Sequence, residues 1–272
     1  MRILFIGDIV GRPGVRIVRQ AVPYLISSEG LDLVVANAEN ACGGSGLTPA
    51  VYHLLRQAGV DAITLGDHIY RRHEIIPLLQ KDEPLCKPAN YPAEAPGRPW
   101  VRVQARDGTP VIVFTLMGRL FMRPVDCPFR AADRVLDQIS AYPYRVVDIH
   151  AEATADKALL GRYLDGKVGA IIGTHTHVPT ADEQLLPNGS AFITDVGMTG
   201  PHDGVIGRRY DKVLASITTN VPVHYDVASG DVRLSGVIVD LHPGTGLAKS
   251  IRRIMLCEKD LSKLSTPVTG TA

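Results

Sequence analysis

Ala170-Ile-Ile-Gly-Thr-His-Thr-His-Val-Pro179 predicts a short buried strand that delivers two histidines into a loop. The strand is expected over Val168–Ile172 and ends at Gly173, before His175 and His177. Side chains alternate along an extended backbone, so residues two apart point the same way. The two imidazoles could therefore share a metal site. The alternative is a polar loop that binds no metal. Residues elsewhere in the chain distinguish a metal site from such a loop.

Composition and length indicate an ordinary globular protein. The chain has 272 residues, 45% of them hydrophobic and 21% charged, and its formal net charge of +1 favours neither a nucleic-acid nor a membrane partner. No segment has the length of a membrane span, and the N-terminus runs into a strand without the pattern of a signal peptide. The four scattered cysteines favour free thiols in a reducing compartment. We therefore expect a cytoplasmic protein.

Most of the chain alternates between predicted strands and helices. Strands are expected at 2–6, 33–36, 62–65, 111–116, 145–149, 168–172 and 191–194, and helices at 15–26, 49–57, 74–80 and 154–164. Thr48-Pro49 is a favourable start for the second helix. The proline-rich segment Lys81–Pro99 is expected to be a long surface loop.

The last part of the chain is predicted to form an antiparallel meander. Its strands are expected at Val213–Thr218, Val223–Val227 and Val232–Leu241, with a hairpin turn at Gly230-Asp231. Together these patterns predict an α/β layered protein with mixed sheets, forming a single domain over residues 1–272. About the last 15 residues are expected to be a disordered tail.

Polar side chains follow five of the predicted strands, where each strand ends. They are Asp8, Glu39, Asn40, Asp67, His68, His150, His175 and His177. Ligands of open α/β sheets bind outside the carboxyl ends of the strands, so these groups can converge. Without His68 these are seven oxygen and nitrogen donors, which are too many for one tetrahedral zinc site and suit two mixed sites that share a carboxylate. Two metals about 3.5–4 Å apart suit hydrolysis of a phosphoester.

Six sequence blocks together carry a family resemblance. They are Gly7-Asp8, Asn37-Ala-Glu-Asn40, Gly66-Asp-His68, Asp148-Ile-His150, Gly173-Thr-His-Thr-His-Val178 and Asp195-Val-Gly-Met-Thr-Gly-Pro201. This set resembles the calcineurin-like metallophosphoesterases, and specifically their bacterial branch of YmdB-like cyclic-nucleotide phosphodiesterases. The resemblance extends from Met1 to about Ile254. It implies a metallophosphoesterase fold of two packed mixed β-sheets flanked by helices.

The resemblance also implies roles for the strand-end residues, with two divalent or trivalent metal ions as cofactors. The first metal would be held by Asp8, Asn40 and His177, the second by Asp67, His150 and His175, and Glu39 would bridge them. His68 would donate a proton to the leaving group, and imidazole suits this role because its proton is available near pH 7. Iron or manganese is expected, although zinc also suits such a mixed donor set.

Two positions depart from the superfamily pattern. Val10 stands where most calcineurin-like enzymes have a histidine, and this is typical of the YmdB-like branch, which uses Glu39 instead. Asp67 stands where the family usually has an asparagine. A further carboxylate leaves less net positive charge on two bound cations. We therefore expect tighter binding of hard cations, together with a weaker pull on the phosphodiester.

Other polar residues near these blocks are weaker candidates. Gly43 and Gly44 match no known phosphate-binding loop pattern and are expected to form a rim loop with at most weak substrate contact. His202 lies in a segment that matches the family near the site, so it is a weak candidate for substrate binding. Cys42 is expected to be a buried thiol. Arg71 and Arg72 are expected to be solvated rather than to bind a phosphate.

The leading hypothesis is a binuclear-metal phosphodiesterase that acts on small phosphodiesters, with 2′,3′- or 3′,5′-cyclic nucleotides as the expected substrates. A metal-bound hydroxide would attack phosphorus while His68 protonates the departing oxygen. One alternative is a phosphomonoesterase of the same superfamily. Another is a regulatory protein that binds nucleotide with little turnover. We expect no stable nucleic-acid partner and no membrane association, and the sequence leaves a homo-oligomer open.

Overall fold

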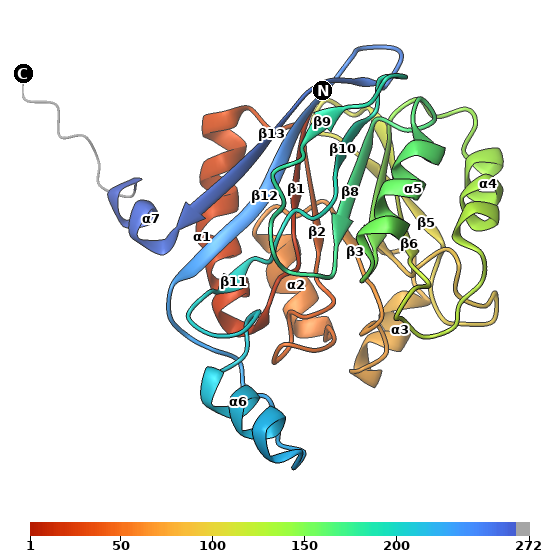
Figure 1. Ribbon diagram of the computed structural model, residues 1–272. Helices are drawn as coiled ribbons and strands as arrows, with labels where there is room; N and C mark the ends of the chain where they lie inside the picture. The colour runs from red at the N-terminus through yellow and green to blue at the C-terminus, as the bar shows by residue number, and fades with distance from the viewer. Residues whose placement is uncertain (265–272) are drawn as a thin grey trace, which may run out of the picture.

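Two mixed β-sheets pack face to face, with helices on both outer faces (Figure 1). This arrangement is seen in the computed structural model, which describes residues 1–264. Between the sheets lies a buried apolar layer that includes Phe5 and Val35 from one sheet and Val113, Val146 and Ile172 from the other. The predicted fold class, α/β with two packed mixed sheets flanked by helices, is confirmed.

The first sheet is built around the N-terminal strand. In spatial order it contains β11 (Gly200–Pro201), β12 (Val232–Leu241), β1 (Arg2–Ile6), β2 (Leu33–Asn37), β3 (Ala62–Thr64) and β4 (Leu85–Cys86), with β13 (Ala248–Cys257) paired to β12. β1, β2, β3 and β4 are parallel, whereas β12 runs antiparallel to β1. Helices α1 (Gly11–Glu29) and α2 (Pro49–Gln57) pack on its outer face.

The second sheet repeats the parallel arrangement. It contains β5 (Trp100–Gln104), β6 (Pro110–Met117), β7 (Arg145–His150), β8 (Ala170–Thr174), β10 (Ala191–Ile193) and β9 (Gln184–Leu185), in that order. β6, β7, β8 and β10 are parallel, and α4 (Pro128–Gln138) and α5 (Thr154–Leu164) cover the outer face. Asn37, at the end of β2, donates a hydrogen bond to Asp148 of β7, so the carboxyl ends of the parallel strands of both sheets lie at the same edge of the molecule.

The predicted start of α2 is confirmed. Thr48 is its N-cap and accepts a hydrogen bond from the backbone N of Val51, and Pro49 is the first helical residue. The helix expected at 74–80 divides into a 3₁₀ turn, η1 (His73–Ile75), and the short helix α3 (Ile76–Leu79). Strands β4, β5, β9, β11 and β13 and helix α4 were not predicted.

The predicted C-terminal meander is wrong in two of its three strands. Residues 213–218 lie in helix α6 (Tyr210–Thr219), which projects below the two sheets in Figure 1. Residues 223–227 form no strand, only an isolated bridge of Val227 with Arg208. Because β12 forms its hairpin with β13, Gly230-Asp231 precedes the hairpin and is not its turn. A six-residue apolar run is too short for its spacing to separate a strand from a helix.

The segment 81–99 is not a surface loop throughout, since residues 85–91 are buried. Lys87 is only 3% exposed because its Nζ donates hydrogen bonds to the carbonyl oxygens of Pro92, Ala93 and Ala95. A lysine satisfied by backbone carbonyls can be buried, and composition alone does not reveal such partners.

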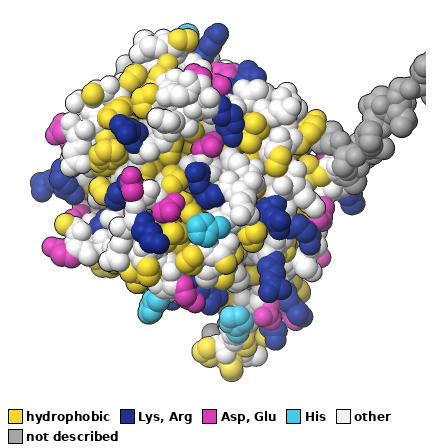
Figure 2. All heavy atoms as spheres, turned by 180° about the vertical axis from the view of Figure 1, so that it is seen from behind, with side chains coloured by type: hydrophobic (Ala, Val, Ile, Leu, Met, Phe, Trp, Pro, Cys, Tyr) yellow, Lys and Arg dark blue, Asp and Glu magenta, His cyan; other side chains and the backbone are white. Residues whose placement is uncertain are grey.

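The expected C-terminal tail begins with a helix, α7 (Glu258–Leu264), while residues 265–272 lie outside the described part of the chain. Among residues 1–264, no helix combines the length and the apolar composition that crossing a membrane requires. On the face seen in Figure 2, basic and acidic side chains are interspersed, which agrees with a net charge near zero.

Candidate metal centre

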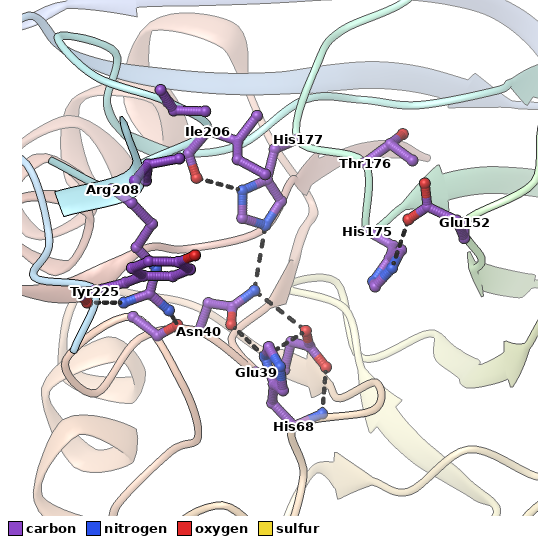
Figure 3. A pocket seen from close by; sticks show the side chains of 13 residues that line it. Glu39, Asn40, His68, Glu152, His175, Thr176, His177, Ile206, Arg208 and Tyr225 are labelled. Atoms are coloured by element: carbon purple, nitrogen blue, oxygen red, sulfur yellow. Dashed lines mark hydrogen bonds and ion pairs between the residues drawn. The ribbon is translucent and has the colours of Figure 1, made fainter. Parts of the chain in front are cut away.

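The carboxyl ends of five parallel strands bring the predicted site residues together. Asp8 follows β1, Glu39 and Asn40 follow β2, Asp67 and His68 follow β3, His150 ends β7, and His175 and His177 follow β8. Each of these eight side chains lies within 4.0 Å of another member of the group. Figure 3 shows several of them around one pocket. Residues from both sheets thus form a single polar cluster.

Four of these residues form a compact group suited to one metal ion. Ligand atoms of Glu39, Asp67, His150 and His175 all lie within 4.8 Å of one another. The Nε2 atom of His150 is 3.3 Å from Glu39 Oε1 and 3.2 Å from Asp67 Oδ1. The Nδ1 atom of His175 is 3.4 Å from the same oxygen of Asp67. Carboxylate and imidazole donors at this density fit a transition-metal cation.

A buried chain of hydrogen bonds sets the orientation of His150. Its Nδ1 lies 2.8 Å from Thr174 Oγ1, and that hydroxyl donates to Asp148 Oδ1 at 2.7 Å. The Thr174 oxygen therefore accepts a hydrogen bond from His150 Nδ1–H, which leaves Nε2 to face the compact group. Burial raises the pKa of Asp148 to about 6, although hydrogen bonds and the neighbouring imidazole oppose the rise. Asp148 stands in one of the family blocks, but no role was predicted for it.

His175 is oriented by a carboxylate that was not predicted from the sequence. Its Nε2 lies 3.1 Å from Glu152 Oε2, so Nδ1 is left to face His150 and Asp67. A metal-binding histidine commonly donates its other ring N–H to a carboxylate in this way. The only sequence signal for Glu152 is its position two residues after His150.

The other side of the cluster contains Asp8, Asn40 and His177. Asp8 is fully buried, and its Oδ2 accepts a hydrogen bond from the backbone N of His175 at 3.0 Å. Its Oδ1 accepts no hydrogen bond from the described residues and lies 4.0 Å from His177 Nε2. Because a buried carboxylate oxygen without a partner is costly, Asp8 Oδ1 fits the role of a cation ligand.

His177 and Asn40 point toward the same position as Asp8 Oδ1. The Nδ1 of His177 lies 3.0 Å from the carbonyl oxygen of Ile206, which directs Nε2 inward. The side-chain amide of Asn40 lies between His177 Nε2, at 3.3 Å, and Glu39 Oε1, at 3.1 Å. It is Nδ2 that faces them, and a half-turn of the amide would present Oδ1 to a cation there.

The carboxylates and imidazoles of the cluster shift one another's pKa values. Burial would raise the pKa of Glu39, but the charge of His150 and hydrogen bonds from His150 and His68 hold it well below its usual range. Asp67 behaves in the same way, because His150 and His175 lower its pKa against the effect of burial. Conversely, burial would lower the pKa of His150, but Glu39 and Asp67 raise it well above its usual value. The cluster therefore stabilises positive charge.

His68 lies at the edge of the cluster and lines the pocket. Its backbone N donates to Glu39 Oε2 at 2.9 Å, and its Nδ1 lies 2.7 Å from Asn40 Oδ1. Burial acts to lower the pKa of His68, but the hydrogen bond and charge of Glu39 and the charge of Asp67 raise it. The two carboxylates therefore favour the protonated form of the ring, and the side chain of His68 remains 25% exposed.

The pocket beside the cluster has a volume of about 360 Å³ and both polar and apolar lining residues. The polar residues belong mostly to the cluster. The apolar ones are Val205, Ile206, Val213 and Tyr225. We call these four residues the apolar wall. The wall was not predicted from the sequence, because its members come from a loop, from α6 and from the segment after α6, none of which carries a motif.

Arg208 joins the apolar wall to the glycine loop (Figure 3). Its guanidinium donates hydrogen bonds to the carbonyl oxygens of Gly43, Gly44 and Tyr225. Gly44 lines the pocket, as expected for a rim loop, whereas Gly43 contributes its carbonyl to Arg208.

Three weaker expectations differ from the structure. His202 does not line the pocket, because its ring turns back so that Nδ1 lies 3.0 Å from the carbonyl oxygen of Gly200. Cys42 is half-buried rather than buried. The Arg72 guanidinium is exposed but contacts the carbonyl oxygen of Ser45, so it is not simply solvated.

Gly66 allows the compact group to pack closely. A Cβ atom at this position would lie 2.3 Å from His150 Nε2 and 2.5 Å from Glu39 Oε2. Both contacts are far shorter than van der Waals distances, so only glycine fits here without displacing the two side chains.

The chain matches known proteins over nearly its whole length. The model of the YmdB-like protein family matches residues 4–254. A protein of Bacillus subtilis strain 168, named 2′,3′-cyclic-nucleotide 2′-phosphodiesterase, is 45% identical over 257 residues, covering 94% of this chain and 97% of that protein.

Two crystal structures have the same fold over nearly their whole length. A hypothetical protein from Thermus thermophilus has a TM-score of 0.89 and 41% identity, covering 94% of this chain and 99% of its own. A protein from Mycoplasma pneumoniae described as a novel phosphatase has a TM-score of 0.88 and 29% identity, covering 97% of this chain and 96% of its own.

Proposed function

This chain belongs to the YmdB-like protein family, and on that premise we propose that it is a metal-dependent phosphodiesterase acting on 2′,3′-cyclic nucleotides. The observation that carries the metal dependence is the donor set. Seven oxygen and nitrogen donor residues meet at one edge, and Asp8 Oδ1 is buried there without a hydrogen-bond partner from the described chain. The name of the Bacillus subtilis relative supports the substrate class.

The donor set divides into two groups. One cation would be held by Asp67, His150 and His175, and the other by Asp8, Asn40 and His177, while Glu39 lies between the groups. When bound, two such cations would polarise the phosphoryl oxygens and lower the pKa of a water molecule. Iron, manganese and zinc all suit these ligands.

His68 is proposed to protonate the departing ribose oxygen. As water attacks phosphorus, the P–O bond to the ribose breaks and that oxygen must gain a proton. The imidazole of His68 lines the pocket, and Glu39 and Asp67 favour its protonated form by raising its pKa against the effect of burial. A proton donor next to the developing charge lowers the barrier most when the leaving group is a poor one.

The apolar wall supports a nucleotide rather than a small polar diester. Ile206 and Tyr225 line the same pocket, beside His177 and Asn40, so a phosphodiester held at the cluster would place an attached base near them. A nucleobase gains stacking energy against an aromatic ring whatever its identity. We therefore expect cyclic nucleotides with different bases to be accepted.

Charge around the pocket favours a diester over a monoester. A phosphomonoester carries more negative charge and benefits from additional cationic donors. Arg208 is the one lysine or arginine among the described pocket-lining residues, and its guanidinium is already bound to three backbone carbonyls. The two alternatives are separated by comparing p-nitrophenyl phosphate with bis-p-nitrophenyl phosphate.

The test of the proposed function is a substrate panel with Mn²⁺-loaded protein. The panel contains 2′,3′-cyclic AMP and GMP, 3′,5′-cyclic AMP, ribose 2,3-cyclic phosphate without a base, and the two p-nitrophenyl esters. We expect turnover of the 2′,3′-cyclic nucleotides and of the synthetic diester, and Tyr225→Ala should raise KM only for substrates that carry a base. Binding of cyclic nucleotide without turnover would instead support the regulatory alternative.

Three further expectations from the sequence remain proposals. They are a single domain over residues 1–272, a cytoplasmic location, and the absence of stable nucleic-acid and membrane partners. The state of association can be measured directly by light scattering.

A further inference from the structure

A buried ion pair lies behind the loop that carries His175 and His177. The Nζ atom of Lys157, on α5, is 2.7 Å from Asp195 Oδ2, and the two side chains are 1% and 0% exposed. Neither residue lines the pocket. The pair therefore does not contact a substrate in the pocket. Its role has to follow from the residues that it does contact.

Both charged groups converge on Thr176, the residue between the two histidines. Asp195 Oδ2 accepts hydrogen bonds from the Thr176 backbone N at 3.0 Å and from its hydroxyl at 2.6 Å. The same hydroxyl accepts a hydrogen bond from Lys157 Nζ at 3.1 Å. Asp195 Oδ1 also accepts from the backbone N of Gly197 at 2.8 Å. Thr176 is thus held by its backbone and its side chain at once.

The histidines on either side of Thr176 have an unfavourable backbone conformation. His175 has φ +94° and His177 has φ +65°, in the left-handed region that residues with a Cβ atom rarely adopt. Such conformations persist only where the surrounding structure imposes them, and they are common at functional sites. The hydrogen bonds between Thr176 and the ion pair can hold the backbone of both histidines in this conformation.

Stability alone does not account for the ion pair. Removing two charges from water is costly, and apolar side chains of similar size often replace a buried pair without loss of stability. The neighbouring backbone is also built closely around it, since a Cβ atom at Gly173 would lie 3.1 Å from Lys157 Cδ and 1.7 Å from the carbonyl oxygen of Thr194.

We propose that Lys157 and Asp195 are positioning residues, which act through Thr176 to hold the loop so that His175 Nδ1 and His177 Nε2 face the metal centre. Without them the loop would relax toward ordinary backbone conformations and turn both imidazoles away. This inference deepens the proposed function and rests on it in one respect, namely that the two histidines bind cations.

Two substitutions test the proposal from different sides. Lys157→Met removes the cation but leaves Asp195 buried without its partner, so it also threatens folding. Thr176→Val keeps the ion pair and the shape of the side chain, and removes only the hydroxyl that links the pair to the loop. Lys87→Met is the matched control, because Lys87 is a buried lysine whose Nζ is bound by three carbonyls of a different segment.

Two measurements are made on the wild-type protein and on the three variants. Hydrogen exchange of the metal-free proteins, read on peptides covering 170–180, reports the order of the loop without reference to any metal. Mn²⁺ titration followed by electron paramagnetic resonance then gives the affinity and the coupling between bound ions. We expect faster exchange of the loop in Lys157→Met and Thr176→Val, with Mn²⁺ affinity reduced about 10-fold or more, as for other residues that orient metal ligands. Lys87→Met should change neither the exchange rate of the loop nor the Mn²⁺ affinity.

The possible outcomes separate this inference from the proposed function. The positioning role is overturned if the loop exchanges at the wild-type rate in both Lys157→Met and Thr176→Val. It is also overturned if exchange is faster but the Mn²⁺ affinity is unchanged. An equal loss of affinity in Lys87→Met would mean that general destabilisation is responsible, which also overturns it. A wild-type protein that binds no Mn²⁺, iron or zinc would refute the metal centre itself, and the positioning role would fall with it.

Discussion

The Nδ1 atom of His175 lies 3.0 Å from the Nε2 atom of His150. His150 uses its other nitrogen to donate to Thr174, and His175 uses its other nitrogen to face Glu152. In their neutral forms the two imidazoles would therefore direct lone pairs at each other. Two lone pairs at this distance repel each other unless a proton or a cation lies between them. The arrangement is thus explained by bound positive charge.

Removal of metal is expected to lower thermal stability. If a cation binds only the folded state, a free concentration about 100 times its Kd adds about 2.7 kcal/mol to the free energy of unfolding. For a chain of this size that corresponds to a rise of several degrees in Tm. Chelator-treated protein should therefore melt at a lower temperature than protein supplied with Mn²⁺, measured by differential scanning fluorimetry. The same Tm with and without Mn²⁺ would contradict the metal centre.

Substitution of the two loop histidines should affect different cations. The side chain of His175 faces Asp67 and His150, whereas that of His177 faces Asn40 and Asp8. His175→Ala should therefore lose the cation of the first of these groups, and His177→Ala that of the second. Elemental analysis after dialysis should find about one ion fewer per chain in each variant. Loss of both ions from either variant would show that the two positions are not independent.

Asp67→Asn should weaken metal binding and raise turnover. Asp67 Oδ1 lies 3.2 Å from His150 Nε2 and 3.4 Å from His175 Nδ1, so its charge acts directly on the proposed metal position. Removing that charge should leave the cation more electrophilic toward the phosphodiester. We expect several-fold weaker Mn²⁺ binding and a several-fold higher kcat on bis-p-nitrophenyl phosphate at saturating metal. Unchanged metal content together with an unchanged rate would refute this account of Asp67.

His68→Ala should reduce the rate according to the leaving group. Loss of a general acid typically lowers a rate by about 10²–10⁴-fold. The loss should be large for cyclic nucleotides, whose ribose oxygen needs a proton, and small for bis-p-nitrophenyl phosphate, whose phenolate leaves without one. Metal content serves as the control, because His68 also contacts Asn40 and Glu39. Equal losses on both substrates would point to a structural role instead.

Gly66→Ala should disrupt the cluster with little effect on the rest of the fold. The added Cβ would clash with His150 and Glu39, so we expect at least a 10-fold loss of metal affinity and a corresponding loss of activity. Gly108→Ala is a suitable comparison: it meets no atom within 4 Å, and its φ of +83° imposes only the usual backbone penalty. Circular dichroism confirms folding in both. Wild-type metal affinity in Gly66→Ala would mean that the side chains around His150 can shift to accommodate the added Cβ atom.

The regular parts of the fold could be predicted because their sequences satisfy local rules. β1 and β2 are mostly apolar runs with polar residues at or just after their ends, and Thr48-Pro49 supplies both the cap and the first residue of α2. The errors occur where burial, rather than spacing, decides the conformation. Residues 213–218 carry apolar side chains in a helix with no buried residue, so their pattern does not reflect a core.

The ligand candidates of the site could be named from sequence because each ends a strand or follows one within three residues. Their supporting residues could not. Glu152, Thr174 and Lys157 matter through contacts between separate strands, loops and helices, and isolated polar residues of these types are common in any chain.

Local pattern and short motifs are enough to predict most strands and helices, the family, and the residue types at the strand ends. Which of those residues meet depends on the folded chain. His175 and His177 are two positions apart on one loop, and alternation along a strand would place them on the same side. Their left-handed backbone, held at Thr176, instead directs His175 toward Asp67 and His177 toward Asn40. That division depends on long-range contacts with Lys157 and Asp195, which local sequence does not encode.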